Sequence, residues 1–386
     1  MTPPKFETDL LAAQEKVHSL PFNLAHLETK LGTKAIFTPD LLQEIKNNKA
    51  TICSEMRKAP HFRTLSKIDH TTRFGKYKVW EEDEDDDDCN HVTIRLMTRV
   101  ELHPDFQFDY WKYSKINRIL RVTNHLQGEK SWVPVPYGFT LESMAWDDEH
   151  ENKKVMQEYR AALWKTMQLW LKSSSRGKII QTTDKIAAQH KSITKVVCFG
   201  LGALSRDKVW YQSAVQHMTA FTIAKCLERA YRKEGAHVQP VDIIFQDPCY
   251  TRKDHELLRT MYPGGRVSFA SDPDGLLAID SNTIVLTAFL PVAYPLMQVM
   301  ADMFHGRKGE GPAAIICDDM ALDLDQELYT LRDRASPAVA RFLTQEYTAS
   351  DFKEHVLEPE LFEDLYGAEG RYRKYWLSRM RFHTRK

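Results

Sequence analysis

The strongest constraint on the fold is a series of short apolar segments in the middle of the chain. The five segments are KVVCF, VDIIF, RVSFA, TIVLTAF and AAIICDD, which begin at Lys195, Val241, Arg266, Thr283 and Ala313. Strands that are covered on both faces of a parallel sheet lose the alternation of polar and apolar side chains, and these segments show little alternation. The series therefore predicts five neighbouring parallel strands.

Segments with helical spacing lie between the predicted strands. In the longest of them, residues 211–235, apolar and small side chains recur at helical spacing from Val215 to Ala230, and Gly235 is suited to end the helix. Shorter helices are expected within residues 252–262, 275–279 and 290–306. Strands that alternate with helices through right-handed crossovers predict an α/β fold with a Rossmann-like, doubly wound, mostly parallel sheet of about five core strands.

The pattern suggests three regions along the chain. Residues 1–190 are mixed and irregular, which predicts an α+β N-terminal region that either packs on the core or stands alone. Residues 191–320 hold the predicted Rossmann-like domain. Residues 321–386 predict a helical C-terminal extension with leucines at helical spacing and a basic end.

The N-terminal region contains an acidic run from Glu81 to Asp88. Consecutive like charges repel one another and do not pack, so the run predicts a solvated loop, with a patch that binds a partner as the alternative. The segments on either side of it, residues 73–80 and 91–100, concentrate β-branched and aromatic residues and are expected to be strands.

A long amphipathic helix is predicted within residues 150–178. Apolar side chains recur there at four-residue spacing, at Val155, Tyr159, Leu163, Met167 and Leu171. We expect the segment Ser173–Gly177 to end this helix.

Composition narrows the class of protein and its surroundings. Lys and Arg total 53 and Asp and Glu total 53, so no overall field draws the chain to nucleic acid or membrane. Six cysteines without a CxxC pair suit a reducing compartment. The N-terminus MTPPKFETDL lacks the pattern of a signal peptide, and no apolar stretch is long enough to span a bilayer. We therefore expect a soluble protein of the cytoplasm, the nucleus or both.

The first predicted strand is followed by two glycines, Gly200 and Gly202, separated by one leucine. Ligands of doubly wound sheets bind beyond the carboxyl ends of the strands, and glycine lets a phosphate or ribose approach the backbone closely. The glycines either mark such a ligand site or only form a tight turn out of the sheet. Because Ser205 stands three residues after Gly202, the motif is GxG and not GxGxxG.

Acidic residues follow the next two predicted strands. Asp247 follows the second strand, and it lies much farther from the glycines than the roughly 20 residues typical of a NAD site. The arrangement better suits a methyl-donor nucleoside such as S-adenosylmethionine, with Asp247 on the ribose hydroxyls and Asp272 near the base. Each acid is also suited to cap a loop or helix.

No recognisable catalytic motif accompanies these residues. The sequence has no P-loop, no nucleophile elbow and no HExxH motif, so the catalytic residues are unknown and no metal site is predicted. Asp318 and Asp319 follow the fifth strand and either bind a metal or cap a helix, with the cap favoured. His217, near the start of the long helix, is interpreted as a surface residue or as a residue at the mouth of a pocket.

Four blocks between residues 190 and 320 resemble a known family. VCFGLGALS, QHMTAFTIAKCL, IIFQDPCYT and SDPDGLLAID are similar to the Sensitivity to Red Light Reduced (SRR-like) domain, most of all to its fungal members. The matching positions are Gly200, Gly202, Ser205 and Gln216 in the first part, and Asp247, Pro248, Tyr250 and Thr251 in the second. With the acid after the third strand, the candidate ligand-binding residues are Gly200, Gly202, Ser205, Gln216, Asp247 and Asp272.

The resemblance implies a regulatory role and carries no settled enzymatic activity; plant relatives are associated with light signalling and circadian timing. Many relatives have a Met-Pro-His-Cys block after the fourth strand, where this chain has Leu290, Pro291, Val292 and Ala293. We therefore expect a non-catalytic regulatory protein with a nucleoside-type pocket over the GxG turn. The alternative is an S-adenosylmethionine-type methyltransferase or another nucleoside-cofactor enzyme. Protein partners are expected at the acidic run or the basic end, and nucleic-acid binding is the weakest hypothesis.

Overall fold

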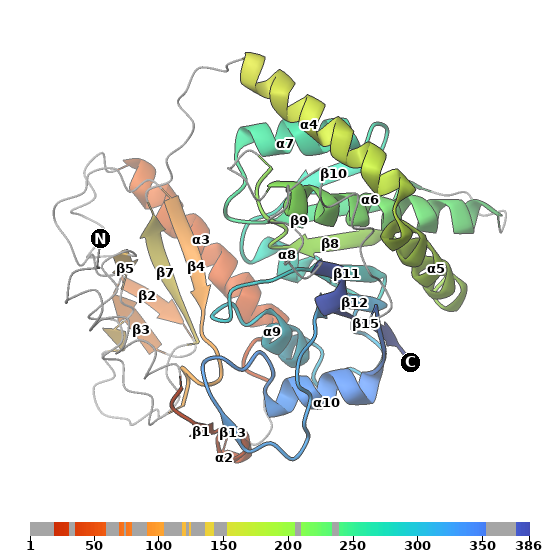
Figure 1. The fold of residues 1–386 in the computed structure, drawn as a ribbon. Coiled ribbons are helices and arrows are strands. Elements are labelled where there is room, and N and C mark those ends of the chain that lie inside the picture. The colour runs from red at the N-terminus through yellow and green to blue at the C-terminus, as the bar shows by residue number, and fades with distance from the viewer. Residues whose placement is uncertain are drawn as a thin grey trace, which may run out of the picture. The chain divides into compact units, whose positions relative to one another are not determined.

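The computed structural model divides the chain into two compact units (Figure 1). The first unit comprises residues 1–145, 291–306 and 320–342, and the second comprises residues 146–290, 307–319 and 343–386. The residues that the structure describes are 19–30, 35–58, 69–72, 75–78, 91–103, 118–120, 123–124, 136–142, 153–204, 210–233, 239–352 and 376–386. The three regions expected from the sequence stay a prediction.

The second unit is built on a seven-stranded sheet in the order β10-β9-β8-β11-β12-β15-β14. Its parallel strands are β8 (Lys195–Phe199), β9 (Asp242–Gln246), β10 (Arg266–Phe269), β11 (Thr283–Thr287) and β12 (Ala314–Asp318). These are the five apolar segments of the sequence, and β8 lies at their centre. The predicted mostly parallel sheet and the Rossmann-like α/β fold are confirmed.

Two antiparallel strands widen this sheet beyond β12. β15 (Met380–Arg385) pairs with β12 on one side and with β14 (Tyr347–Asp351) on the other. The predicted C-terminal helical extension contains the helix α10 (Pro337–Glu346), but it also contains these strands. Apolar and basic residues alternate at the start of β15, where Met380 and Phe382 are buried and Arg381 is half-buried, but His383 is buried as well.

Helices pack on the sheet of the second unit (Figure 1). α6 (Trp210–Lys233) contacts β8 and β9, and α4 (Lys153–Lys172) and α5 (Ser174–Gln189) in turn contact α6. α7 (Arg252–Met261) contacts β10, while α8 (Asp274–Leu277) contacts β8 and β9. No helix in the described part of the chain is both long and apolar enough to cross a membrane.

The expected end of the long helix is confirmed, because α4 ends at Lys172, directly before Ser173. A second helix follows at once: α5 begins at Ser174. Ser173 is the N-cap of α5, and its hydroxyl accepts the Arg176 backbone N–H at 3.2 Å. The serines therefore start a second helix, as the preference of serine for the N-cap allows.

The first unit consists of small antiparallel sheets and helices. One sheet contains β4 (His91–Leu96), β7 (Tyr137–Glu142) and β5 (Arg118–Leu120), another contains β2 (Asp69–Thr72), β3 (Gly75–Lys78) and β6 (Thr123–Asn124), and β1 (Phe22–Asn23) pairs with β13 (Leu328–Tyr329). Its helices are α2 (Leu24–Lys30), α3 (Pro39–Lys58) and α9 (Leu296–Met303). The two strands expected around the acidic run are present as β3 and β4, which belong to different sheets; the run itself lies outside the described residues.

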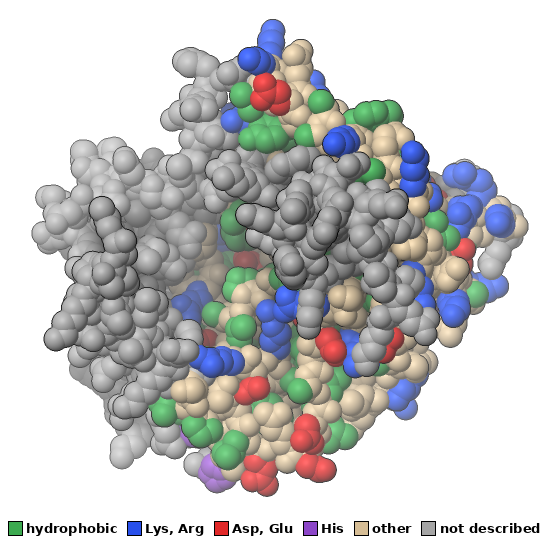
Figure 2. Space-filling view, viewed as in Figure 1, with side chains coloured by type: hydrophobic (Ala, Val, Ile, Leu, Met, Phe, Trp, Pro, Cys, Tyr) green, Lys and Arg blue, Asp and Glu red, His purple; other side chains and the backbone are tan. Residues whose placement is uncertain are grey.

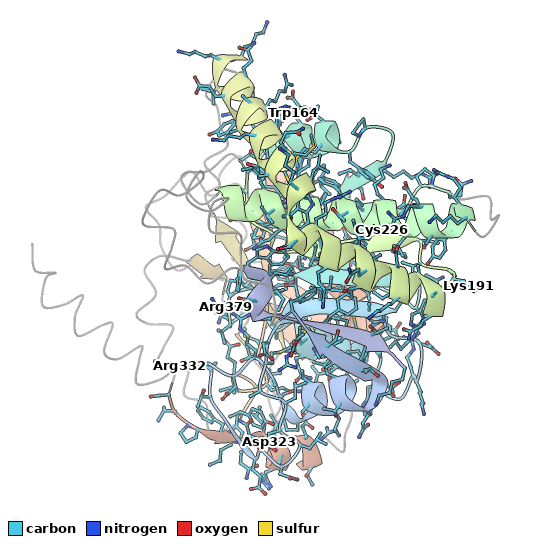
Figure 3. The ribbon with its side chains drawn as sticks, turned by 45° about the vertical axis from the view of Figure 1, so that its right-hand side comes forward. Trp164, Lys191, Cys226, Asp323, Arg332 and Arg379 are labelled. Carbon is cyan, nitrogen blue, oxygen red and sulfur yellow. The ribbon has the colours of Figure 1, made fainter. Side chains whose placement is uncertain are left out.

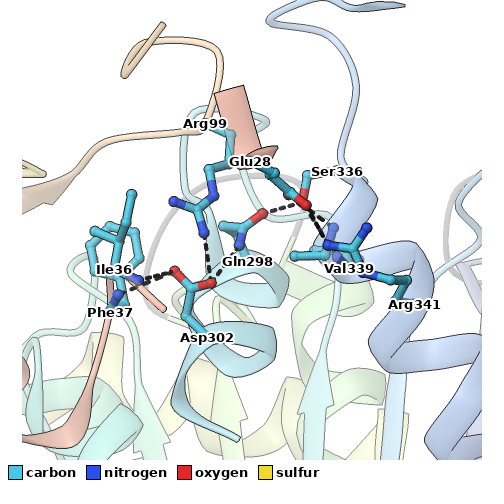
Figure 4. A network of polar contacts seen from close by, with 10 residues as sticks. Glu28, Ile36, Phe37, Arg99, Gln298, Asp302, Ser336, Val339 and Arg341 are labelled. Carbon is cyan, nitrogen blue, oxygen red and sulfur yellow. Dashed lines mark hydrogen bonds and ion pairs between the residues drawn. The ribbon is translucent and has the colours of Figure 1, made fainter. Parts of the chain in front are cut away.

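A buried polar network holds distant segments of the first unit together (Figure 4). Asp302 on α9 accepts the backbone N–H groups of Ile36 and Phe37, both at 3.1 Å. It also accepts Arg99 Nη2 at 2.8 Å and Gln298 Nε2 at 3.0 Å. A buried ion pair stabilises a fold only when its remaining polar atoms are hydrogen-bonded. The carboxylate of Asp302 meets that condition, whereas Arg99 Nε and Nη1 are buried without a hydrogen-bond partner.

Candidate functional site

The candidate site lies at the carboxyl edge of the parallel strands in the second unit. Strands β10, β9 and β8 are neighbours and run in the same direction, so the residues that follow them meet at one edge. Gly200 follows β8, Asp247 follows β9 and Asp272 lies shortly after β10. The order of the strands reverses between β8 and β11, where ligands of such sheets usually bind.

Asp247 is joined directly to the glycine turn. The backbone N–H of Gly202 donates to Asp247 Oδ2 at 2.8 Å, and the backbone N–H of Cys249 donates to Oδ1 at 2.8 Å. Burial raises the pKa of Asp247, while these two N–H donors act in the opposite direction. The structure thus brings Gly202 and Asp247 together, two residues that the sequence suggested as parts of one candidate site.

The fold itself explains why glycine is needed at both positions of the turn. Gly200 and Gly202 have φ values of 63° and 80°, which favour glycine. A Cβ at Gly200 would overlap Leu290 Cδ2, and a Cβ at Gly202 would overlap the Ser213 hydroxyl. The chain's own side chains therefore approach the turn as closely as a ligand would, which favours the interpretation of a tight turn.

Asp272 is held by the residue that ends β9. Gln246 Nε2 donates to Asp272 Oδ1 at 2.6 Å, and Gln246 Oε1 accepts the Gly275 backbone N–H at 2.9 Å. Gln246 is buried, so this bridge ties the end of β9 to the segment after β10. Sequence analysis did not select Gln246, although it directly precedes Asp247.

The two remaining predicted residues contribute differently. Gln216 lies on α6 and is buried. Ser205 lies outside the described residues. The structure therefore places Gly202 next to Asp247, and Asp272 next to Gln246, while the assignment of all six residues to one ligand stays a prediction.

The sequence suggested that His217 is a surface residue or lies at the mouth of a pocket. Both interpretations are wrong. The side chain of His217 is fully buried; Nδ1 lies 2.6 Å from the Ser213 carbonyl and Nε2 lies 2.6 Å from the Tyr250 hydroxyl. Since a carbonyl only accepts, Nδ1 carries the proton and Tyr250 donates to Nε2. Burial lowers the pKa of His217 to about 4, so the imidazole is neutral at pH 7.

Asp254 is a second residue that sequence analysis missed. Its Oδ2 accepts the Thr251 backbone N–H at 2.7 Å, and the Thr251 hydroxyl caps the N-terminus of α7 in return. Its Oδ1 accepts the Leu204 backbone N–H at 2.6 Å, just beyond the glycine turn. The spacing of Thr251 and Asp254 is that of a capping box with aspartate in place of glutamate, which was the signal available in the sequence.

The edge near β11 and β12 differs from expectation. Asp318 Oδ1 accepts the Phe289 backbone N–H at 3.0 Å, and Asp319 Oδ1 accepts Arg381 Nε at 2.7 Å. The expected helix cap is wrong, because no helix follows directly: the next helix in the described part of the chain is α10. The described residues contain no group of three or more His, Cys, Asp or Glu side chains that could hold a metal ion.

A buried hydroxyl lies at the point where the strand order reverses. Thr287 ends β11 and is in register with Phe199, directly before Gly200 on β8. Its Oγ1 is buried and has no hydrogen-bond partner in the structure. Two residues later, Phe289 has a φ of 52°, which is unusual for a residue other than glycine. The guanidinium of Arg379, which is labelled in Figure 3, lies 4.8 Å from the centre of the Phe289 ring.

Comparison with known proteins identifies the family. A family model described as the SRR1 domain matches residues 171–377, more than half of the chain. The chain belongs to the SRR1 domain family. No curated protein and no solved structure shows a significant match to it. The match to the SRR1 domain spans the whole carboxyl edge described above, from the glycine turn to Asp319.

Proposed function

We propose that this member of the SRR1 domain family is a regulatory protein that binds a nucleoside-type small molecule at the carboxyl edge of its sheet without converting it. The observation that carries the proposal is the Asp247 carboxylate at the end of β9, fixed by two backbone N–H groups beside the glycine turn. Each carboxylate oxygen keeps a further lone pair, so the carboxylate is able to accept hydrogen bonds from the two hydroxyls of a ribose.

The surrounding residues favour binding over chemistry. A general base needs a pKa near the working pH and access to the substrate. His217 is buried, both of its ring nitrogens have partners, and its pKa is about 4. Burial also raises the pKa of Tyr250 well above its usual value. These groups hold the site in shape, which supports a regulatory role.

The position of the ligand follows from the side chains that fill the edge. Leu290 lies over Gly200, so a ligand is expected on the side of Asp247 and Asp272. Thr287, whose buried hydroxyl has no hydrogen-bond partner, ends β11, which flanks β8 on the side away from β9 and Asp247.

Isothermal titration calorimetry with S-adenosylmethionine, NAD and ATP tests the proposal. We expect heat with at least one of them and a loss of affinity of about tenfold or more in Asp247→Asn, because the amide replaces an acceptor by a donor. Asp242→Asn is the matched control, since Asp242 begins the same strand and its side chain is 46% exposed at the opposite edge. If none of the three compounds releases heat, or if Asp247→Asn binds as tightly as Asp242→Asn, the proposal is wrong.

An S-adenosylmethionine-dependent methyltransferase is the second candidate, favoured by the same carboxylate at the end of the second strand. The two proposals differ in whether the bound methyl donor is consumed. Incubation of the protein with S-adenosylmethionine and a mixture of small-molecule and protein acceptors should leave S-adenosylhomocysteine at the background level. Formation of S-adenosylhomocysteine that disappears in Asp247→Asn would replace the regulatory proposal by the enzymatic one.

A further inference from the structure

The helix α4 exposes two large apolar side chains on one face. Trp164 is 62% exposed and Leu171 is 45% exposed. Large apolar side chains that are exposed together are a common mark of an interaction site. At 100° per residue, two residues seven positions apart point within about 20° of each other, and they lie about 10 Å apart along the helix axis. Trp164 and Leu171 therefore form one short apolar stripe, and Trp164 is labelled on α4 in Figure 3.

A neighbouring face of α4, about 100° from the apolar stripe, already provides the contacts that hold the helix in place. Met156, Leu163 and Trp170 are buried in the hydrophobic core of the second unit. Trp170 also donates its indole N–H to the Thr222 hydroxyl at 2.9 Å. The two tryptophans of the helix thus differ: one is buried and hydrogen-bonded, while Trp164 contributes little to the core. An exposed tryptophan that folding does not need is a common anchor of protein interfaces.

Basic side chains line one side of the apolar stripe. α4 has five basic residues and one acidic residue, Glu158. Lys154, Lys165 and Lys172 are exposed, and their spacing of 11 and 7 residues places them within about 20° of one another on the helix. They form a row about 80–100° from Trp164, and the exposed Glu158 lies beside this row, which leaves it with a net positive charge. Figure 2 shows Lys and Arg side chains beside apolar ones along α4.

We infer that this surface, the α4 face defined by Trp164, Leu171 and the lysine row, docks an acidic amphipathic helix of a partner protein. The apolar residues of the partner would cover Trp164 and Leu171, and its carboxylates would meet the lysines. A second copy of this chain fits poorly, because two basic α4 faces would repel each other. The inference is independent of the ligand proposed for the sheet edge.

Synthetic peptides test the inference on the full chain. The probe is a fluorescein-labelled 18-residue peptide with leucine at positions i, i+3, i+4 and i+7, glutamate at four positions beside the leucines and alanine elsewhere, because too many glutamates would repel one another and unfold the helix. Its controls are the same peptide with lysine in place of glutamate, and a scrambled acidic peptide. Fluorescence anisotropy should show binding of the acidic amphipathic peptide alone. Raising NaCl should weaken this binding, since exposed charges are screened.

Variants locate the binding on the α4 face. The double variant Trp164→Ala/Leu171→Ala should raise the Kd at least about tenfold, as the loss of an interface anchor does. The double variant Lys165→Glu/Lys172→Glu should raise the Kd of the acidic peptide about three- to tenfold. The same variant should gain binding of the lysine peptide, which the unmodified chain does not bind. The matched control is Leu324→Ala/Leu328→Ala, which removes side chains that are 55% and 56% exposed in the first unit and should leave the Kd unchanged.

Other outcomes would overturn the inference. These are no binding of the acidic amphipathic peptide, or equal binding by the α4-face and control variants. Anionic vesicles or single-stranded RNA that bind through Trp164 and the lysines, while the peptide does not, would assign the surface to a membrane or to nucleic acid. Dimerisation by analytical ultracentrifugation that is lost in Trp164→Ala/Leu171→Ala would assign it to a second copy. Circular dichroism of each variant should match the unmodified chain, because the replaced side chains are exposed.

Discussion

At the scale of single residues, the carboxyl edge is organised by contacts between side chains and backbone. Asp247 bonds to the backbone of the glycine turn, and Gln246 bridges from β9 to Asp272. Sequence spacing was enough to select Asp247 and Asp272, because each follows an apolar strand. It could not show that Leu290 and Ser213 occupy the space over the glycines, because those approaches depend on side chains that are distant in sequence.

Gly202→Ala tests what the glycine turn requires. Gly202 has a φ of 80°, and an added Cβ would overlap the Ser213 hydroxyl, so we expect a loss of roughly 2–3 kcal/mol in the free energy of unfolding. Gly264 is the matched control, because its φ is 74° but nothing lies within 4 Å of an added Cβ. Gly264→Ala should cost about 1 kcal/mol, the price of the backbone conformation alone. Urea denaturation measures both values.

The double variant Gly202→Ala/Ser213→Ala separates the two causes further. Removing the Ser213 hydroxyl should recover part of the loss, since the overlap involves that atom. Equal losses in Gly202→Ala and Gly264→Ala would contradict the close approach of Ser213.

At the scale of elements, the parallel strands were predictable and the helix faces were less so. Four of the five strands lack polar alternation, so their type could be inferred from local pattern. The edge strand β10 does alternate, and the order of the strands within the sheet depends on contacts that are distant in sequence. For α4, the apolar residues noted at four-residue spacing drift by about 40° at each step, which turns Leu171 about 160° away from Val155. The buried stripe instead follows Met156, Leu163 and Trp170, which explains why Leu171 is exposed.

α7 provides a prediction at this scale. Asp254 accepts backbone N–H groups from Thr251 at the start of α7 and from Leu204 beyond the glycine turn. Asp254→Asn should lower the free energy of unfolding by about 2 kcal/mol, because it weakens a helix cap and leaves a buried donor without its charged acceptor. Thr260→Ala on the same helix removes only a hydroxyl bonded to its own helix backbone and should change stability by less than about 0.5 kcal/mol. Similar thermal unfolding curves for the two variants would contradict this role of Asp254.

At the scale of the whole molecule, neutral buried histidines link stability to pH. His217 on α6 and His383 on β15 are buried, and burial lowers the pKa of each to about 4. Their ordinary pKa is 6.5, so between pH 6.5 and 4 the unfolded chain binds protons that the folded chain does not. The stability that the two neutral rings support is complete above pH 6.5 and decreases as the pH falls toward 4.

The expected size of the pH effect is large enough to measure. Each histidine should contribute on the order of 3 kcal/mol over this window, which makes the slope up to roughly 2–3 kcal/mol per pH unit near pH 5.5. Burial raises the pKa values of Asp247 and Asp302. Protonation of these two carboxylates at lower pH favours the folded chain and opposes the effect of the histidines. The slope of stability against pH should therefore be measured between pH 6.5 and 5. Urea denaturation across this range measures it. Burial also lowers the pKa values of His190 and His255, so His217→Gln should reduce the slope by less than half. A slope that His217→Gln leaves unchanged would contradict the assignment.

The position of β15 within the sheet has a consequence for synthesis. β15 lies between β12 and β14, yet about 60 residues separate the end of β12 from its start. At roughly 5–20 residues per second, the ribosome would leave the β12 edge uncovered for several seconds after that strand is made. Ile315 and Ile316 would then sit on an open strand, which is the kind of edge that pairs with other chains. Nascent copies of this protein should therefore depend on a chaperone that covers the β12 edge until β15 has been made.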